Sequence, residues 1–283
     1  MTASISAVEI RPEMTRGEED LWCELIERRS GNWFSEKRLY LLRSCLWREM
    51  QHRGIATFGD YYRLVEKNAD VWNSLLDRCV NRETLFFRHM ASYTALADEL
   101  LPVIRAQRVR QGGNRIALWS AGCSSGEEAY SMAIAAKEAP PPGCFQFDVL
   151  GSDLSGEAVA MARRAVYGPR PVAEMPEMLR RRYLERRERG YEVNAAIRAM
   201  VRFEQCNLTD PSTYPAAPQD VIFCQNVFIY FREAMRVQVA AGFARCLRPG
   251  GFLVPAPGEL IGLALPGLKW LRLRNTMVLE RGG

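Results

Sequence analysis

Short apolar runs alternate with helix-like segments after residue 115, and this alternation constrains the fold more than any other feature of the chain. The runs are RIALWSA, FDVLGSD, VRFEQCN, DVIFCQN and GGFLVPA. Strands that alternate with helices predict a parallel sheet with helices on both faces. The tail LKWLRLRNTMVLE reads as two strands joined at Arg274-Asn275, which would close the sheet with an antiparallel hairpin. We therefore expect an α/β, Rossmann-like domain.

The chain before this region shows helical periodicity and no strand-like alternation. The apolar face of the first expected helix consists of Leu21, Trp22, Leu25 and Ile26. A chain of 283 residues is long enough for two domains. We expect a helical domain over residues 1–88 and an α/β domain over residues 89–283. The arginine-rich, proline-interrupted segment 169–200 departs from the alternation, and a small inserted subdomain and a solvated basic surface helix explain it equally well.

Composition narrows the class of protein without naming a function. Hydrophobic residues make up 48% and charged residues 25% of the chain, as in ordinary globular proteins. No apolar run approaches the ~18 residues of a membrane span, and the N-terminus lacks the pattern of an export signal. We expect a cytoplasmic protein with no membrane insertion. The net charge of +5 favours an acidic partner over nucleic acid.

The eight cysteines and two histidines do not form a recognisable metal or disulfide pattern. No two cysteines stand in a C-x-x-C spacing, and His52 and His89 lie in different contexts. We therefore expect no metal site, no disulfide framework, and reduced, mostly buried thiols.

A turn of small residues, 121–126, directly follows the first expected strand. In doubly wound sheets ligands bind beyond the carboxyl ends of the strands, and small residues let the backbone approach them. The next strand ends in Asp153, whose carboxylate suits the two hydroxyls of a ribose. An ordinary helix N-cap explains Asp153 equally well when it is taken alone.

Two further strands also end in polar residues. One ends at Asn207-Leu208, and another ends at Asn226, with Tyr230 four residues later. Amides at strand ends suit the edge of a planar base. Glu127 and Glu128 open the helix after the turn, where they would repel a pyrophosphate and suit the cationic groups of S-adenosylmethionine. The charge pattern therefore favours a methyl donor over a dinucleotide.

Six motifs together make the chain similar to the CheR-type chemotaxis receptor glutamate methyltransferases. They are ETLFFR (83–88), WSAGCSSGEEAYSMAI (119–134), SDLSGEAVAMARRAVYG (152–168), FEQCNL (203–208), IFCQNVFIYF (222–231) and LRPGGFLVPAPGEL (247–260). The resemblance implies a class I methyltransferase sheet, a helical N-terminal domain and a small inserted subdomain. It also implies S-adenosylmethionine as cofactor and a monomeric enzyme that methylates glutamates on the cytoplasmic helical bundle of a methyl-accepting receptor.

The same resemblance assigns roles to individual residues. Arg88 and Tyr230 would be catalytic, with Arg88 holding the acceptor carboxylate and Tyr230 near the transferred methyl. The cofactor would be bound by Thr84, Arg88, Gly122, Glu127, Asp153, Asn207, Leu208, Asn226 and Val227. For Phe86 and Phe87 we prefer core packing between the two domains.

The chain also departs from the family at several positions. Arg82 stands where the family usually has asparagine, Gln225 replaces a usual arginine, and a G-H-S-E segment appears here as PAPGE, which keeps Glu259. A non-catalytic cofactor-binding scaffold and a methyltransferase with another substrate therefore remain alternatives. The basic residues of the second helix (Lys37, Arg38, Arg43, Arg48 and Arg53) either face an acidic receptor or form an exposed amphipathic face. The short ERRERGYEV segment favours an enzyme that does not grip a receptor peptide.

Overall fold

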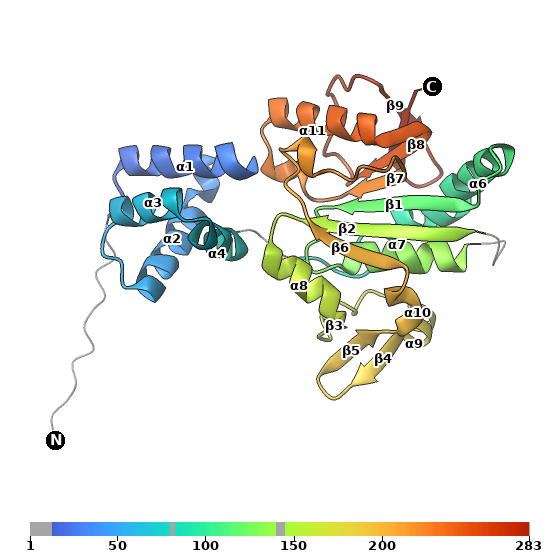
Figure 1. The fold of residues 1–283 in the computed structure, drawn as a ribbon, viewed down its shortest axis with the longest axis horizontal. Helices are drawn as coiled ribbons and strands as arrows, with labels where there is room; N and C mark the ends of the chain where they lie inside the picture. Colours follow the sequence, from blue (N-terminus) through green and yellow to red (C-terminus); the bar gives the residue numbers. More distant parts are fainter. Residues whose placement is uncertain (1–12, 80–82, 140–144, 283) are drawn as a thin grey trace. The chain divides into compact units, whose positions relative to one another are not determined.

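A computed structural model describes residues 13–79, 83–139 and 145–282 of the chain. The chain forms two compact units, Met1–Asn81 and Arg82–Gly283 (Figure 1). Within the described residues no helix is both long and apolar enough to cross a membrane.

The first unit is helical, as the sequence predicted. Its elements are α1 (Arg16–Ser30), the 3-10 turn η1 (Glu36–Arg38), α2 (Leu39–Arg53), α3 (Phe58–Lys67) and α4 (Ala69–Cys79). Helix α1 begins at Thr15, whose hydroxyl accepts the N–H of Glu18 while the Glu18 carboxylate accepts the N–H of Thr15. This reciprocal pair satisfies N–H groups that have no partner within the helix.

Burial of one face of each helix builds the core of this unit. Trp22, Leu25 and Ile26 are buried as predicted, whereas Leu21 is 49% exposed. The prediction for Leu21 was wrong because the buried stripe of α1 is narrower than the apolar run in its sequence. Each large side chain buried in this way stabilises the fold by about 1.5–3 kcal/mol.

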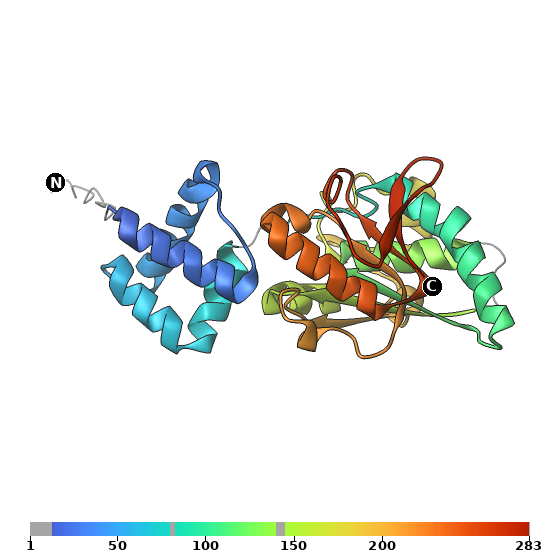
Figure 2. The same cartoon turned by 90° about the horizontal axis from the view of Figure 1, so that it is seen from above.

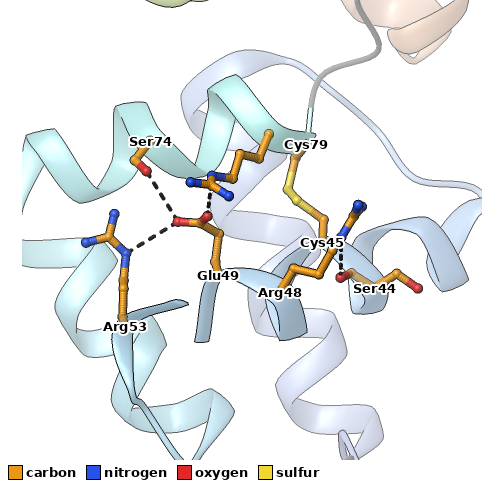
Figure 3. The surroundings of a disulfide bond; sticks show 8 residues. Ser44, Cys45, Arg48, Glu49, Arg53, Ser74 and Cys79 are labelled. Atoms are coloured by element: carbon orange, nitrogen blue, oxygen red, sulfur yellow. Dashed lines mark hydrogen bonds and ion pairs between the residues drawn. A yellow bond between two sulfur atoms is a disulfide. The ribbon is translucent and has the colours of Figure 1, made fainter. Parts of the chain in front are cut away.

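A disulfide joins Cys45 of α2 to Cys79 at the end of α4 (Figure 3). The expectation of reduced thiols throughout the chain is therefore wrong. The two cysteines are 34 positions apart, and the packing of α2 against α4 brings their Cα atoms to 5.7 Å. Since this proximity arises from tertiary packing, no local spacing reveals it.

The second unit is built on a mixed sheet that has seven strands among the described residues, in the order β6-β2-β1-β7-β8-β10-β9. The strands are β1 (Arg115–Ala121), β2 (Gln146–Asp153), β6 (Val201–Gln205), β7 (Gln219–Cys224), β8 (Leu247–Pro255), β9 (Leu268–Arg272) and β10 (Met277–Arg281). The first five are parallel, and β10 runs antiparallel to both β8 and β9. The predicted parallel sheet and its closing hairpin are confirmed.

Alternate residues of the strands face two separate cores. On β1, Leu118 belongs to one core and Trp119 to the other. The first core includes residues of α6 and α7, and the second includes residues of α11 (Figure 2). The helices of this unit are α5 (Met90–Ala95), α6 (Leu101–Arg110), α7 (Glu127–Glu138), α8 (Gly156–Arg164) and α11 (Glu233–Cys246), with a π turn at Leu96–Leu100. This period of two is the reason that short apolar runs predicted buried strands.

Phe86 and Phe87 are buried in the first of these cores, and their packing partners lie within the second unit. The backbone N–H of Phe86 donates to the carbonyl of Pro171, and that of Phe87 donates to the Ser131 hydroxyl. The segment 83–88 is thus held by the α/β unit.

The segment between α8 and β6 forms a small subdomain. It contains β3 (Val166–Tyr167), α9 (Glu177–Tyr183), β4 (Leu184–Arg187), β5 (Gly190–Val193) and α10 (Ala195–Arg198). Within the described residues its antiparallel strands make a sheet of three, in the order β3-β5-β4, apart from the main sheet (Figure 1). Of the two sequence-based interpretations, the inserted subdomain is the one observed.

Candidate cofactor-binding site

The predicted site residues gather where the order of the strands reverses. Strand β1 lies between β2 on one side and β7 on the other. In doubly wound sheets, loops that leave the carboxyl ends of such strands diverge to opposite sides, and ligands bind between them. The turn 121–126 follows β1, Asp153 ends β2, and Asn226 follows β7.

Glycine is required at position 122 of the turn. Its φ is +84°, in the left-handed region, and an added Cβ would lie 2.5 Å from Val227 Cγ2. The N–H groups of Gly122 and Cys123 both donate to the carbonyl of Ser152, each at 2.8 Å, which ties the turn to the end of β2. The structure thus brings Gly122 and Val227 together.

Asp153 connects this turn to the start of α8. One carboxylate oxygen accepts the N–H of Ser124 at 2.8 Å, and the other accepts the N–H of Ser155 at 2.9 Å. Ser155 is the residue that caps α8, through a hydrogen bond from the N–H of Ala158 to its hydroxyl. Asp153 is therefore not the helix cap, and its carboxylate lies where the turn after β1 meets the end of β2.

Two buried glutamates lie directly behind the turn. The Ser125 hydroxyl donates to Glu127, and the Ser120 hydroxyl donates to Glu128. Burial raises the pKa of Glu127 to about 7 and the pKa of Glu128 to about 8, because desolvation disfavours the charged carboxylate. A cation bound beside them would relieve that penalty.

A third carboxylate, Glu259, organises the loop after β7. It accepts the backbone N–H groups of Ala256, Asn226 and Ile229 at 2.9, 3.2 and 3.3 Å. Burial raises the pKa of Glu259, and these hydrogen bonds act in the opposite direction. The loop that it holds includes Asn226, whose φ is +61°.

Asn226 and Asn207 are both engaged in the structure. The side-chain oxygen of Asn226 lies 2.9 Å from Nε2 of His89. That of Asn207 accepts from the N–H and the hydroxyl of Thr209. Leu208 is buried, and its carbonyl accepts the hydroxyl of Tyr214 at 2.6 Å. The amide oxygen of Asn207 thus fixes a local turn, whereas that of Asn226 contacts a residue distant in the sequence.

The remaining predicted residues are Thr84, Arg88 and Tyr230. Thr84 is half-buried, and the exposed Arg88 donates to the carbonyl of Glu83. Burial raises the pKa of Glu128, and the positive charge of Arg88 is a smaller effect in the opposite direction. Tyr230 is half-buried on the 3-10 turn Phe228–Tyr230, which Glu259 anchors through the N–H of Ile229.

Sequence reasoning missed three features of this site. It did not find the contact of His89 with Asn226, the support of Glu128 by Ser120, or the three hydrogen bonds to Glu259. The retained glutamate of the PAPGE segment was the available signal for Glu259. Gln225, which replaces the arginine usual in the resembling family, is buried and donates to the Ser92 hydroxyl at 2.9 Å.

The donor set fits S-adenosylmethionine. At Gly122 a side chain would clash with Val227, so the backbone is open to a ligand there. The Asp153 carboxylate binds this turn and the start of α8, and the buried Glu127 and Glu128 have raised pKa values. Within the described residues no group of three or more histidine, cysteine, aspartate or glutamate side chains could hold a metal ion.

A doubly wound sheet with an antiparallel strand near one edge, together with the match to a SAM-binding domain, defines the protein as a class I S-adenosylmethionine-dependent methyltransferase. The chain belongs to the CheR methyltransferase family. Residues 82–262 match the family model for the CheR methyltransferase SAM binding domain, and residues 18–78 match the model for the CheR methyltransferase all-alpha domain.

Several curated relatives are similar over most of the chain. The chemotaxis protein methyltransferase of Borreliella burgdorferi is 29% identical over 253 residues, which cover 88% of this chain and 89% of that protein. Chemotaxis protein methyltransferase 1 of Vibrio cholerae is 30% identical over 250 residues, 86% of this chain and 89% of that protein. The probable biofilm formation methyltransferase WspC of Pseudomonas putida is 32% identical over 232 residues, 81% of this chain and 53% of that protein.

Proposed function

We propose that this methyltransferase transfers the methyl group of S-adenosylmethionine to glutamate side chains of a methyl-accepting chemoreceptor, forming glutamate methyl esters. The observation that carries the proposal is the buried Glu127–Glu128 pair behind the turn of a CheR-family sheet. The names of the chemotaxis relatives support the receptor as acceptor. The acceptor would be the cytoplasmic helical bundle of the receptor, with the enzyme acting as a monomer.

The cofactor, when bound, supplies an activated methyl group on a positively charged sulfur. Asp153 would hold the ribose, and the buried glutamates would favour the cationic end together with Thr84. Asn207, Leu208, Asn226 and Val227 would line the base. A glutamate acceptor is ionised at neutral pH and needs no general base. The work of the protein is therefore alignment of the two reactants and exclusion of water.

Arg88 and Tyr230 are the residues that we propose to position the acceptor. Arg88 is exposed beside the site, and a guanidinium can hold a carboxylate through two parallel hydrogen bonds. Tyr230 would position the acceptor by a hydrogen bond from its hydroxyl. Neither role requires proton transfer, because the carboxylate oxygen is the nucleophile as it stands.

Docking of the basic residues of η1 and α2 (Lys37, Arg38, Arg43, Arg48 and Arg53) on an acidic receptor is a further part of the proposal. Arg43 binds both oxygens of Glu19, and Arg53 binds Glu49. These two arginines serve the helical unit itself. Arg48 donates to the carbonyl of Ser44, and the guanidinium of Arg38 lies over the ring of Phe34, so all four arginines also have contacts within the helical unit. Contact with a receptor would draw on the whole basic set.

Methyl transfer to receptor fragments tests the proposal. The enzyme is incubated with tritiated S-adenosylmethionine and a purified cytoplasmic receptor fragment, and mild alkali then releases ester-bound label as volatile methanol. We expect alkali-labile label that disappears when the acceptor glutamates are replaced by alanine. Calorimetric binding of S-adenosylhomocysteine with no label transferred would instead indicate a non-catalytic scaffold. Alkali-stable label would indicate another acceptor chemistry.

A further inference from the structure

The disulfide of the helical unit has a second cross-link beside it. Glu49 is fully buried one turn after Cys45 on α2, and Arg78 directly precedes Cys79 on α4. The guanidinium Nε of Arg78 lies 2.6 Å from one oxygen of Glu49, and the Ser74 hydroxyl donates to the other at 3.3 Å. Figure 3 shows the covalent and the ionic link side by side between the same two helices.

The ionic link stands on its own chemistry and does not require the sulfur bridge. Arg53 also donates to Glu49, so this buried carboxylate has two guanidinium partners and one hydroxyl partner. Separating a buried carboxylate from its partners is costly, which holds the two helices together. Cleavage of the disulfide would therefore leave α2 and α4 packed and the two sulfurs close to each other.

The two cysteines are unequally exposed. Cys45 is 4% exposed, whereas Cys79 is half-buried at the end of its helix. A small thiol can reach the sulfur of Cys79 more readily than that of Cys45. The other cysteines within the described residues form no disulfide and are Cys23, Cys123, Cys206, Cys224 and Cys246.

We propose that Cys45–Cys79 is a reversible thiol–disulfide modification site that exchanges with low-molecular-weight monothiols of the glutathione class. Disulfides in a reducing compartment are usually transient, and a pair held in place by a separate ionic link is suited to repeated opening and closing. The proposal goes beyond methyl transfer, and its test needs no methyl-transfer activity.

The exchange is balanced in two steps. A monothiolate attacks the Cys79 sulfur, which forms a mixed disulfide and releases the Cys45 thiolate, and this thiolate takes up a proton. A second monothiolate attacks the sulfur of the bound monothiol, which releases the Cys79 thiolate and a disulfide of the two monothiols. Two monothiols are thereby oxidised while one protein disulfide is reduced to two thiols. The reverse sequence closes the site.

Equilibration of the full chain in glutathione buffers tests the proposal. The ratio of reduced to oxidised glutathione is varied from the poise of secretory compartments to that of the cytosol. Samples are quenched with acid, alkylated and mapped by peptide mass spectrometry. We expect Cys45 and Cys79 to become alkylated together in one transition within this range. A pair that stays oxidised in the most reducing buffer, or stays reduced in the most oxidising one, overturns the proposal.

Variants of the Glu49–Arg78 ion pair test whether this pair favours re-formation of the Cys45–Cys79 disulfide. Glu49→Gln removes the charge that binds Arg53 and Arg78. After reduction of the disulfide, α2 and α4 of this variant therefore keep the Cys45 and Cys79 thiols close to each other less of the time. The transition should move toward more oxidising buffers by about tenfold in the glutathione ratio. Ser74→Ala, which removes one contact to the same carboxylate, should produce a smaller shift in the same direction and replaces Glu49→Gln should that variant not fold. Glu24→Gln, at an exposed position of α1, is the matched control and should not shift it. An unshifted transition in both link variants refutes the role of Glu49.

Discussion

Replacement of Gly122 by alanine tests whether the turn after β1 is built for close approach. The residue has a φ of +84°, and the new Cβ would lie 2.5 Å from Val227 Cγ2. Two separate costs follow from these observations. One is the left-handed backbone conformation of a residue with a side chain, and the other is overlap with a half-buried valine.

A matched control separates the two costs. Gly262 has the same φ of +84°, and nothing lies within 4 Å of the position its Cβ would take. The left-handed conformation costs about 1–2 kcal/mol, of which about 0.4–1 kcal/mol is recovered because alanine restricts the unfolded chain. Gly262→Ala should therefore destabilise the protein by about 1 kcal/mol. Gly122→Ala adds about 1–3 kcal/mol of overpacking and should cost about 2–4 kcal/mol.

Shortening Val227 also removes the steric overlap with the new Cβ at position 122. In Gly122→Ala/Val227→Ala the methyl group that the new Cβ meets is absent, so the double variant should be more stable than the sum of the two single changes predicts. A coupling of about 1–3 kcal/mol is expected for residues in direct contact. Urea denaturation of the wild type, the two single variants and the double variant measures this coupling.

Cofactor affinity provides the functional part of the test. Calorimetric titration with S-adenosylhomocysteine should show at least tenfold weaker binding to Gly122→Ala and nearly unchanged binding to Gly262→Ala. Such a loss corresponds to about 1.4 kcal/mol. Equal destabilisation by the two glycine substitutions, or an additive double variant, would show that Val227 does not enforce glycine at position 122.

Three further predictions follow from the buried charges and from Tyr230. Unfolded glutamate titrates near its ordinary value of 4.5, whereas Glu127 and Glu128 in the folded protein titrate near 7 and 8, so between these values the folded state retains protons that the unfolded state releases. The free energy of unfolding should therefore fall as pH rises from about 5 to 8, and the decline in melting temperature should flatten in Glu128→Gln. Asp220→Ala should cost about 3–5 kcal/mol in urea denaturation, because it leaves the buried Arg108 without its carboxylate and Ala117 N–H without its acceptor. Tyr230→Phe should lower turnover more than it lowers affinity for S-adenosylhomocysteine, and steady-state kinetics with unchanged turnover would remove Tyr230 from the reaction.

The sheet was predictable because its signal is local. Leu118 and Trp119 face opposite cores, and the same alternation recurs at Val221 and Ile222. A parallel strand covered on both faces therefore needs a short apolar run, as β1, β7 and β8 show, whereas the edge strand β6 carries Arg202 and Glu204 on exposed positions. The hairpin of β9 and β10 was visible for the same reason.

The cross-links of the helical unit were not predictable, because they arise from packing. Cys45 and Cys79 approach each other only after α2 lies against α4, and Glu49 is fully buried only because Ser74 and Arg78 project from the facing helix. In sequence Glu49 is one more glutamate on an amphipathic helix. Partner identity across helices is set by tertiary geometry, which periodicity does not encode.

The candidate site lies between these two cases. Its backbone features follow from local sequence, since small residues at 121–126 and a carboxylate at 153 mark strand ends. Its electrostatics do not follow from local sequence, because the raised pKa values of Glu127 and Glu128 depend on burial by residues distant in sequence.

The neutral amide of Gln225 adds no positive charge to this edge, where the family usually places an arginine. The opposing charge that does act on Glu128 comes from Arg88, outside the buried set. An edge with buried carboxylates and an exposed arginine would favour a cationic cofactor in its interior and an anionic acceptor at its mouth, which is the arrangement that methyl transfer to a carboxylate requires.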